Sequence, residues 1–375
     1  MLSSEPPEPT PARLPTRAEL VRRPLPASVL NSVPVTGFPE SLPELDGRLV
    51  QALQEAAIPG MALAIAQGGR LVAMRGYGTL TLGSPVAVEP TLPAMLCSLC
   101  KPLTAQAFLV LAQEDKLTLE DRADRWITID PRITLRQLLT HRSGLAEKFL
   151  DTSHAATEAE HVKKALTEPL TFTPDERFLY SNVGYQVLGR ILAAVTGQRP
   201  DLFIQKRLLD PLGIRSYFVA TYLTPADRVR YDSGGAYVLT PHRYDKETRR
   251  HMPVRDRATS LAKEAFGSSD TSGAGCMSAV DFLHFLCSIT PAQRQRIRKH
   301  ASATGGYGLG WMLKDGGLAH TGIGSGETHY ALTRESGVSY VCFLPSSNDE
   351  ACERVLARVQ NLVLRLKPSP ELPWL

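Results

Sequence analysis

The sequence lacks a long hydrophobic run, and none reaches the roughly 18 residues that a membrane-spanning helix requires. Residues 1–20 contain no apolar stretch of the kind found in a secretory signal peptide. Six cysteines in 375 residues are too few for a disulfide framework. We therefore expect a cytoplasmic protein with reduced thiols and no association with membranes. A formal net charge of +4 gives no reason to expect a nucleic-acid-binding surface.

Several catalytic signatures are also missing. The chain has no H-E-x-x-H pair, and its nine histidines show no ligand-like spacing, so no metal is expected. It has no G-x-S-x-G, which excludes the nucleophile elbow of the α/β-hydrolases as a motif. It also has no phosphate-binding glycine loop and no other cofactor fingerprint, so no cofactor is expected.

Cys97 and Cys100 form the one C-x-x-C of the sequence. Such a pair is typical of a redox site or of half a zinc site. Since no second pair exists, we interpret both as small core residues on either side of Ser98. Redox control of that serine is the alternative.

Prolines mark the first boundary in the chain, because ten of the 28 lie in residues 1–43. This density disfavours a helix or a central strand, so residues 1–41 are expected to form a disordered or extended arm. Apolar residues at helical spacing begin at Leu45. The spacing of apolar residues predicts helices at 45–57, 102–116, 135–139, 183–195, 279–288 and 348–366. Alternation and turn signals predict strands at 61–66, 71–75, 308–313, 318–322, 327–333 and 339–344.

Strands near both ends, with helices between them, indicate an α+β fold with one antiparallel sheet flanked by helices. Residues 42–114 and 266–375 would form the lobe that contains this sheet. Residues 115–265 would form an inserted, mainly helical lobe, in which 220–265 are expected to be long loops. The active site would lie in the cleft between the lobes.

The first candidate for chemistry is Ser98, followed three residues later by Lys101, an arrangement that places both on one face of a helix. A serine hydroxyl needs a base to act as a nucleophile, and a lysine that is neutral part of the time is suitable. The motif alone is weak, since Ser260 and Lys263 repeat it.

Two further segments carry groups suited to proton transfer or to substrate binding. Tyr180 and Asn182 form the one Y-x-N of the chain, in which the phenol can relay a proton and the amide can hold the lysine or the substrate. His320-Thr321-Gly322 ends a short apolar stretch, and its glycine allows a substrate to lie against the backbone. The backbone N–H groups of Ile323 and Ser98 are candidates for an oxyanion hole.

The order Ser98-x-x-Lys101, Tyr180-x-Asn182, His320-Thr321-Gly322 resembles that of the class C β-lactamase family. This family includes penicillin-binding D-alanyl-D-alanine peptidases, D-aminopeptidases, esterases, 6-aminohexanoate-oligomer hydrolases and acyltransferases. The segments LLTHRSGL (138–145), FLYSNVGY (178–185) and YGLGW (307–311) are also similar to family segments. The resemblance covers roughly residues 42–365, and Ser260 fails it because that serine follows the tyrosine motif.

The resemblance implies an α/β sandwich of β-lactamase type and a small-molecule ester, amide or lactam substrate. Ser98 would form the acyl-enzyme, while Lys101 and Tyr180 would move its proton. Asn182 and the strand at 320–323 would orient the substrate. Where many β-lactamases have lysine this chain has His320, so we favour hydrolysis of an ester, amide or small lactam over β-lactamase or carboxypeptidase activity. An acyltransferase with the same residues is a second reading, and a non-catalytic binding protein a third.

Overall fold

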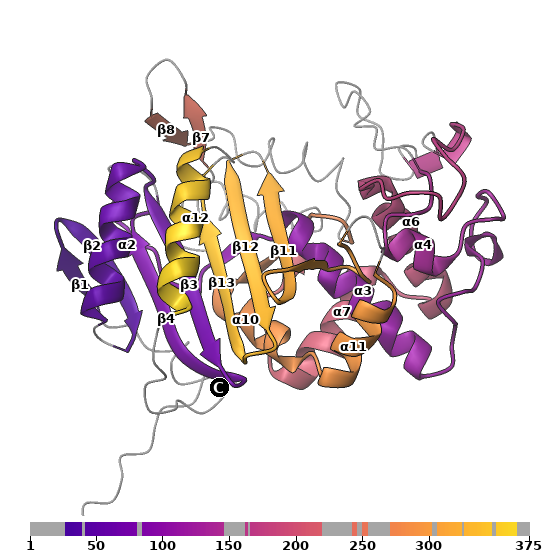
Figure 1. Ribbon diagram of the computed structural model, residues 1–375, viewed down its shortest axis with the longest axis horizontal. Coiled ribbons are helices and arrows are strands. Elements are labelled where there is room, and N and C mark those ends of the chain that lie inside the picture. The colour runs from indigo at the N-terminus through magenta and orange to yellow at the C-terminus, as the bar shows by residue number, and fades with distance from the viewer. Residues whose placement is uncertain are drawn as a thin grey trace, which may run out of the picture.

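A computed structural model describes residues 27–39, 42–80, 85–145, 162–163, 166–219, 242–245, 250–253, 271–301, 306–324, 326–346 and 350–365. Its largest element is an antiparallel sheet of eight strands in the order β1-β2-β4-β3-β13-β12-β11-β10 (Figure 1). These strands are β1 (Ala27–Leu30), β2 (Val33–Phe38), β3 (Gly60–Gln67), β4 (Arg70–Gly78), β10 (Met312–Lys314), β11 (Gly317–Gly324), β12 (Glu327–Arg334) and β13 (Val338–Leu344). Segments far apart in the sequence therefore lie side by side, with Ala64 of β3 opposite Val341 of β13.

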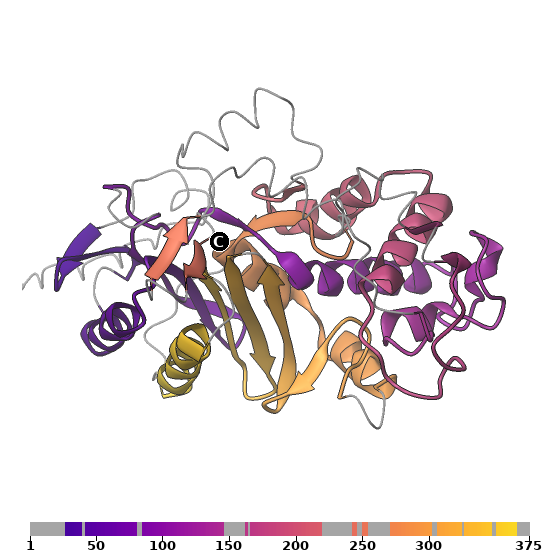
Figure 2. The same cartoon turned by 90° about the horizontal axis from the view of Figure 1, so that it is seen from above.

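Helices cover both faces of this sheet. On one face, α2 (Pro43–Glu55) and α12 (Glu350–Val363) pack against each other and bury Leu49 and Val359 over the strands (Figure 2). The other face carries α10 (Ala279–Ser288), which contacts β3 and β13. The apolar residues of α2 and α12 recur every three or four positions, so each helix turns one apolar face to the sheet.

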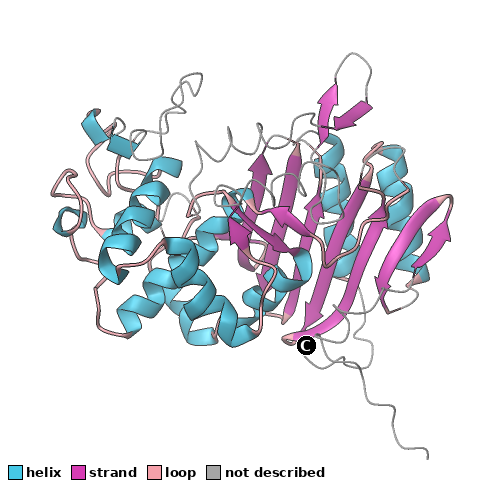
Figure 3. Ribbon diagram, turned by 180° about the vertical axis from the view of Figure 1, so that it is seen from behind, coloured by secondary structure: helices cyan, strands magenta, loops and turns pink. Residues whose placement is uncertain are grey.

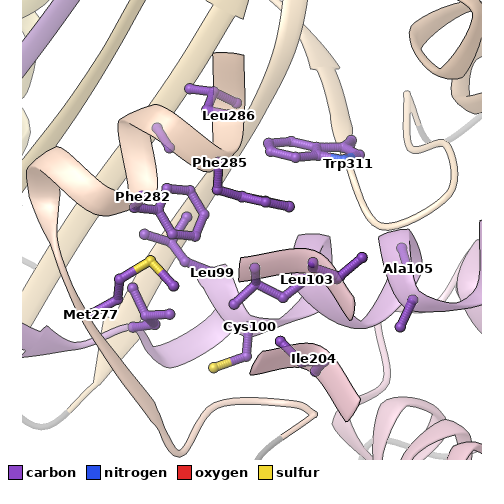
Figure 4. Packing of buried hydrophobic residues seen from close by; sticks show 14 of the residues in the cluster. Leu99, Cys100, Leu103, Ala105, Ile204, Met277, Phe282, Phe285, Leu286 and Trp311 are labelled. Atoms are coloured by element: carbon purple, nitrogen blue, oxygen red, sulfur yellow. The ribbon is translucent and has the colours of Figure 1, made fainter. Parts of the chain in front are cut away.

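The remaining helices gather to one side of the sheet (Figures 1 and 3). They include the short 3₁₀ turns η1 (Cys97–Leu99), η2 (Ala123–Arg125) and η4 (Asp210–Leu212), the π-helical turn η3 (Gln205–Leu209), and the helices α3 (Cys100–Gln113), α4 (Leu135–Leu139), α6 (Asn182–Thr196), α7 (Pro200–Ile204) and α11 (Pro291–Lys299). Helix α3 is central, because every residue from Cys100 to Leu109 is buried. Figure 4 shows Leu103 of this helix among side chains from α7 and α10. A helix buried on all sides holds its first turn firmly in place.

Two smaller sheets complete the fold. Strands β5 (Pro93–Met95), β9 (Gly275–Ser278) and β6 (Phe218–Val219) form a three-stranded sheet in the order β5-β9-β6. It joins the residues just before Ser98 to a segment that arrives from the second half of the chain. Strands β7 (His242–Asp245) and β8 (Arg250–Pro253) form a separate hairpin.

A buried ion pair links α2 to the sheet. Arg75 of β4 donates to both carboxylate oxygens of Asp46, with the bond from Nε measuring 3.0 Å, and Tyr77 donates to the same carboxylate at 2.9 Å. The Arg75 side chain is 1% exposed and that of Asp46 is 7% exposed. Removal of either partner would leave an uncompensated charge in the core.

The α+β class with one antiparallel sheet is confirmed. Helices are present at the predicted positions 45–57, 102–116, 135–139, 183–195 and 279–288, and strands at 61–66, 71–75, 318–322, 327–333 and 339–344. The last predicted helix corresponds to α12, although its predicted start at residue 348 lies outside the described residues. The division into lobes, with a cleft between them, stays a prediction.

Of the two alternatives for the arm at residues 1–41, residues 27–38 adopt the extended one, because they form the hairpin β1–β2. Pro34 pairs with Val29 of β1, but the pairing of β2 with β4 begins only at Val35. Pro34 therefore has a strand on one side only, a position at which proline is tolerated. Residues 1–26 lie outside the described residues.

Two strand and loop predictions need correction. The strand expected at 308–313 is reduced to β10, because Gly310 adopts a left-handed φ of +75° that turns the chain. The stretch 220–265, expected to be loops, contains the hairpin β7–β8, and its other residues lie outside the described part of the chain.

Candidate active site

Ser98 lies in η1, at the junction between β5 and α3. The chain reaches it through Cys97, whose φ of +49° is in the left-handed region that disfavours residues with side chains. The Leu96 N–H holds this turn by donating to the Gly275 carbonyl at 2.7 Å. Ser98 itself is half-buried, whereas Cys97 and Leu99 on either side of it are buried.

Lys101 is fully buried one turn after Ser98. Its Nζ lies 3.1 Å from Ser98 Oγ, 2.7 Å from Asn182 Oδ1 and 2.9 Å from the Ser272 carbonyl oxygen. These three contacts match the three donors of an ammonium group. The predicted grouping of Ser98, Lys101 and Asn182 is therefore present in the structure.

The same contacts are suited to proton abstraction. A neutral amine has two N–H bonds and one lone pair. The oxygens of Asn182 and Ser272 accept hydrogen bonds, so they take the two N–H bonds when Lys101 loses a proton. The lone pair can then accept the proton of Ser98 Oγ, which lies 3.1 Å away.

The ring of Tyr180 lies next to the Lys101 side chain. Lys101 Nζ lies 4.9 Å from the centroid of the Tyr180 ring, close enough for a cation–π interaction. Tyr180 is half-buried just before α6, and Ser181 caps that helix by accepting from the Gly184 N–H at 3.1 Å. Ser181 provides the cap of this helix, so the Asn182 amide is not needed as a cap and contacts Lys101.

Strand β11 lies against the serine turn because it has glycine at two positions. A Cβ on Gly322 would lie 2.4 Å from the Leu96 carbonyl oxygen, and one on Gly324 would lie 2.7 Å from Cys97 Sγ. Both distances are shorter than a carbon atom allows. The contact of Gly322 with a substrate stays a prediction, and in the structure this glycine accommodates the backbone just before Ser98.

The outer edge of β11 is only partly paired within the described residues. Strand β10 pairs with residues 317–319 only, so in the described part of the chain no strand pairs with that edge from His320 onward. Thr321 is half-buried there, and Ile323 is 46% exposed. An extended substrate can bind along such an edge. The pairing of the Ile323 and Ser98 N–H groups as an oxyanion hole stays a prediction.

His320 is buried, with 1% of its surface exposed. Its Nδ1 lies 2.7 Å from the Thr321 carbonyl oxygen, which can only accept, so Nδ1 carries the proton and Nε2 accepts from the Tyr307 hydroxyl at 2.9 Å. Burial, with the charge of Lys101, lowers the pKa of His320 to about 3. The imidazole is therefore neutral at pH 7. Its predicted contact with the substrate stays a prediction.

Cys97 and Cys100 have different partners. Cys97 Sγ lies 3.6 Å from Oε2 of the buried Glu327, whereas Cys100 Sγ accepts from the Gly275 N–H at 3.3 Å. Among the described residues, neither cysteine forms a disulfide. Their interpretation as small core residues beside Ser98 fits this packing.

Sequence reasoning missed two contributors to this site. The Ser272 carbonyl leaves no trace in a sequence, because every residue has one. His141 lies in the quoted segment LLTHRSGL without a role, although its ring centroid is 4.2 Å from that of Tyr180. The one sequence feature that pointed to His141 was its position in LLTHRSGL (138–145), which is similar to a segment of the family.

Within the described ranges, no group of three or more His, Cys, Asp or Glu side chains is arranged to hold a metal ion. Among the same residues, no helix has the length and apolar character needed to cross a bilayer.

Comparison with known proteins identifies the family. The family model described as Beta-lactamase matches residues 45–365, so the chain belongs to the β-lactamase family. Protein flp from Staphylococcus aureus (strain COL) is 27% identical over 211 residues, which cover 52% of this chain and 42% of the relative. The chain thus spans less than half the length of that curated relative.

Solved structures agree on the fold. The octameric penicillin-binding protein homologue from Pyrococcus abyssi has a TM-score of 0.72 at 22% identity, covering 88% of this chain and 79% of its own. The D-amino acid amidase from Ochrobactrum anthropi SV3 has a TM-score of 0.68 at 18% identity, covering 85% of this chain and 98% of its own. The β-lactamase-type sandwich expected from the motifs is therefore confirmed.

Proposed function

We propose that this protein is a serine hydrolase that cleaves an ester or amide bond of a small molecule through an acyl-enzyme on Ser98. The observation that carries the proposal is the environment of Lys101. Its Nζ contacts Ser98 Oγ and two further oxygen acceptors, all within 3.1 Å. This arrangement supports a lysine that removes the serine proton and is held in place while it does so.

The reaction would proceed in two stages. Ser98 Oγ attacks the substrate carbonyl while its proton moves to Lys101, and the N–H groups of Ser98 and Ile323 stabilise the oxyanion. Tyr180, next to Lys101, passes a proton to the leaving group and regains one from Lys101. Water then attacks the acyl-enzyme as it loses a proton to the same pair, and that proton passes to Ser98 Oγ when the bond to the acyl group breaks.

The electrostatics of β11 favour a substrate without a carboxylate beside the scissile bond. A lysine on this strand would attract a carboxylate, but His320 is neutral, hydrogen-bonded and buried. The exposed side chain on the same edge, Ile323, is apolar. Neutral esters and amides fit this edge better than penicillins or peptides ending in a carboxylate.

The test is intact-protein mass spectrometry after incubation with activated esters and amides. It compares wild type, Ser98→Ala and Ser260→Ala, since Ser260 begins the other S-x-x-K and is a matched control. We expect an acyl adduct on wild type and Ser260→Ala but none on Ser98→Ala. The absence of an adduct and of turnover with every compound would contradict the proposal.

Further arms separate the related activities. Half of each sample is given an amine, and loss of the adduct to amine faster than to water would identify an acyltransferase. A chromogenic β-lactam is assayed beside the esters. Turnover of the β-lactam at a rate comparable with the esters would overturn the proposed substrate preference.

A further inference from the structure

His141 follows α4 and adopts a backbone conformation that is unusual for histidine. Its φ is +56°, in the left-handed region, and its side chain is 1% exposed. Its Nε2 is buried and has no hydrogen-bond partner among the residues that the structure describes. A left-handed φ and an unpartnered buried N–H each cost free energy, and such costs concentrate at functional positions. His141 therefore carries two local free-energy costs, one from its backbone conformation and one from its buried N–H, next to the candidate site.

The contacts of His141 lie on both sides of Tyr180. Its carbonyl accepts from the Leu179 N–H at 2.9 Å, and its Nδ1 accepts from the Ser181 N–H at 3.0 Å. Between these bonds the imidazole stacks on the Tyr180 ring, with centroids 4.2 Å apart and planes inclined by 32°. One residue thus fixes the backbone before and after the tyrosine as well as its ring.

These contacts require a neutral imidazole. Because Nδ1 accepts a hydrogen bond, the proton lies on Nε2, among the rings of Phe178, Tyr185 and Tyr307. A phenylalanine would stack on Tyr180 without burying an unpartnered N–H. The feature that phenylalanine cannot supply is the acceptor for the Ser181 N–H.

We infer that His141 is a positioning residue, which holds Tyr180 beside Lys101 by accepting the Ser181 N–H and stacking on the phenol ring. This inference rests on the proposed function, because it assigns His141 no proton transfer of its own. In the proposed mechanism, Tyr180 is the residue that transfers the proton, and its ring lies 4.9 Å from Lys101 Nζ. Loss of the acceptor would let Tyr180 shift relative to Lys101, and a displacement of about 1 Å is enough to slow chemistry roughly a hundredfold.

Two substitutions separate the parts of this role. His141→Phe keeps an aromatic ring but removes the acceptor, and it leaves the Ser181 N–H unpaired. His141→Asn loses the ring but offers Oδ1 as an acceptor near the place of Nδ1, and asparagine tolerates a left-handed φ. His300→Phe, at a half-buried histidine outside the site, is the matched control.

The experiment measures the rate of acylation of Ser98 by an activated ester in a single turnover, followed by mass spectrometry. Each His141 variant is made in wild type and in Tyr180→Phe, and thermal unfolding checks that every variant is folded. We expect His141→Phe to slow acylation by about tenfold to a hundredfold. His141→Asn should recover most of that rate, and His300→Phe should match wild type.

The decisive result is the coupling between the two positions. If His141 acts through Tyr180, then His141→Phe should change the rate by less than about threefold once Tyr180 is phenylalanine. An equal loss in both backgrounds, or wild-type rates in a folded His141→Phe, would overturn the inference. Failure of the proposed function would look different, since the wild type itself would then form no adduct.

Discussion

Stability should fall on mild acidification, because three fully buried imidazoles are neutral in the folded protein. Burial is the main cause of the lowered pKa of His141, His320 and His329, and the charge of Lys101 adds to it at the first two. The pKa falls to about 3 at His320 and to about 4 at His329, from 6.5 in an unperturbed histidine. Below pH 6.5 the unfolded chain therefore binds more protons than the folded one.

The sign and size follow from this difference in bound protons. Stability is fully present above pH 6.5 and decreases as the pH falls, until the folded histidines titrate near pH 3 to 4. Each histidine removes about 1.4 kcal/mol between pH 7.5 and pH 5.5, so the three together remove roughly 4 kcal/mol. Arg136 keeps the pKa of Asp175 well below 3.8, so the loss of that carboxylate lies outside this range.

The assay is urea unfolding followed by circular dichroism at pH 7.5 and pH 5.5. His329→Gln is the informative variant, because His329 Nε2 donates to the Met95 carbonyl at 2.9 Å and a glutamine amide can do the same without titrating. We expect the variant to lose about 1.4 kcal/mol less than wild type over this range. A wild type that loses under about 1.4 kcal/mol, or a variant with an unchanged loss, would refute the reasoning.

Three further outcomes are expected. Gly322→Ala should slow acylation of Ser98 at least about tenfold in mass-spectrometric assays, since the added carbon meets backbone 2.4 Å away; an unchanged rate would contradict this packing. Asp46→Ala should cost about 3–5 kcal/mol in urea unfolding, because Arg75 would remain buried without its partner, and a loss below about 1 kcal/mol would count against the pair. Ester turnover should be equal with and without a thiol reductant, because Cys97 and Cys100 bond to different partners, and activation by reductant would favour redox control.

Local periodicity predicted the long elements of the fold. Helix α10 lies at the predicted residues 279–288, because its apolar positions repeat at helical spacing next to the capping Ser278. Strands β5, β6 and β9 escaped prediction, since two to four residues are too few to show a period. Their pairing also joins distant segments, which no local pattern reveals.

The candidate site also contains residues that the sequence predicted and residues that it did not. Ser98, Lys101 and Asn182 were found from their spacing and order, and the structure brings them into contact. Contributions to the site that come from a backbone group or from a strained backbone conformation could not be predicted from the sequence. The Ser272 carbonyl has no sequence signature, and the left-handed backbone of His141 is a property of the folded chain.

The strand order has a consequence for biosynthesis. Strand β3, with the apolar sequence GMALAIAQ, pairs on one side with β4, which follows it directly, and on the other with β13 near the end of the chain. During translation the second edge of β3 has no partner until residues 338–344 leave the ribosome. An apolar edge exposed for that long is a target for unwanted strand pairing. Truncated chains that end before residue 338 should therefore aggregate, and chaperones that cover exposed strands should improve the yield of the whole protein.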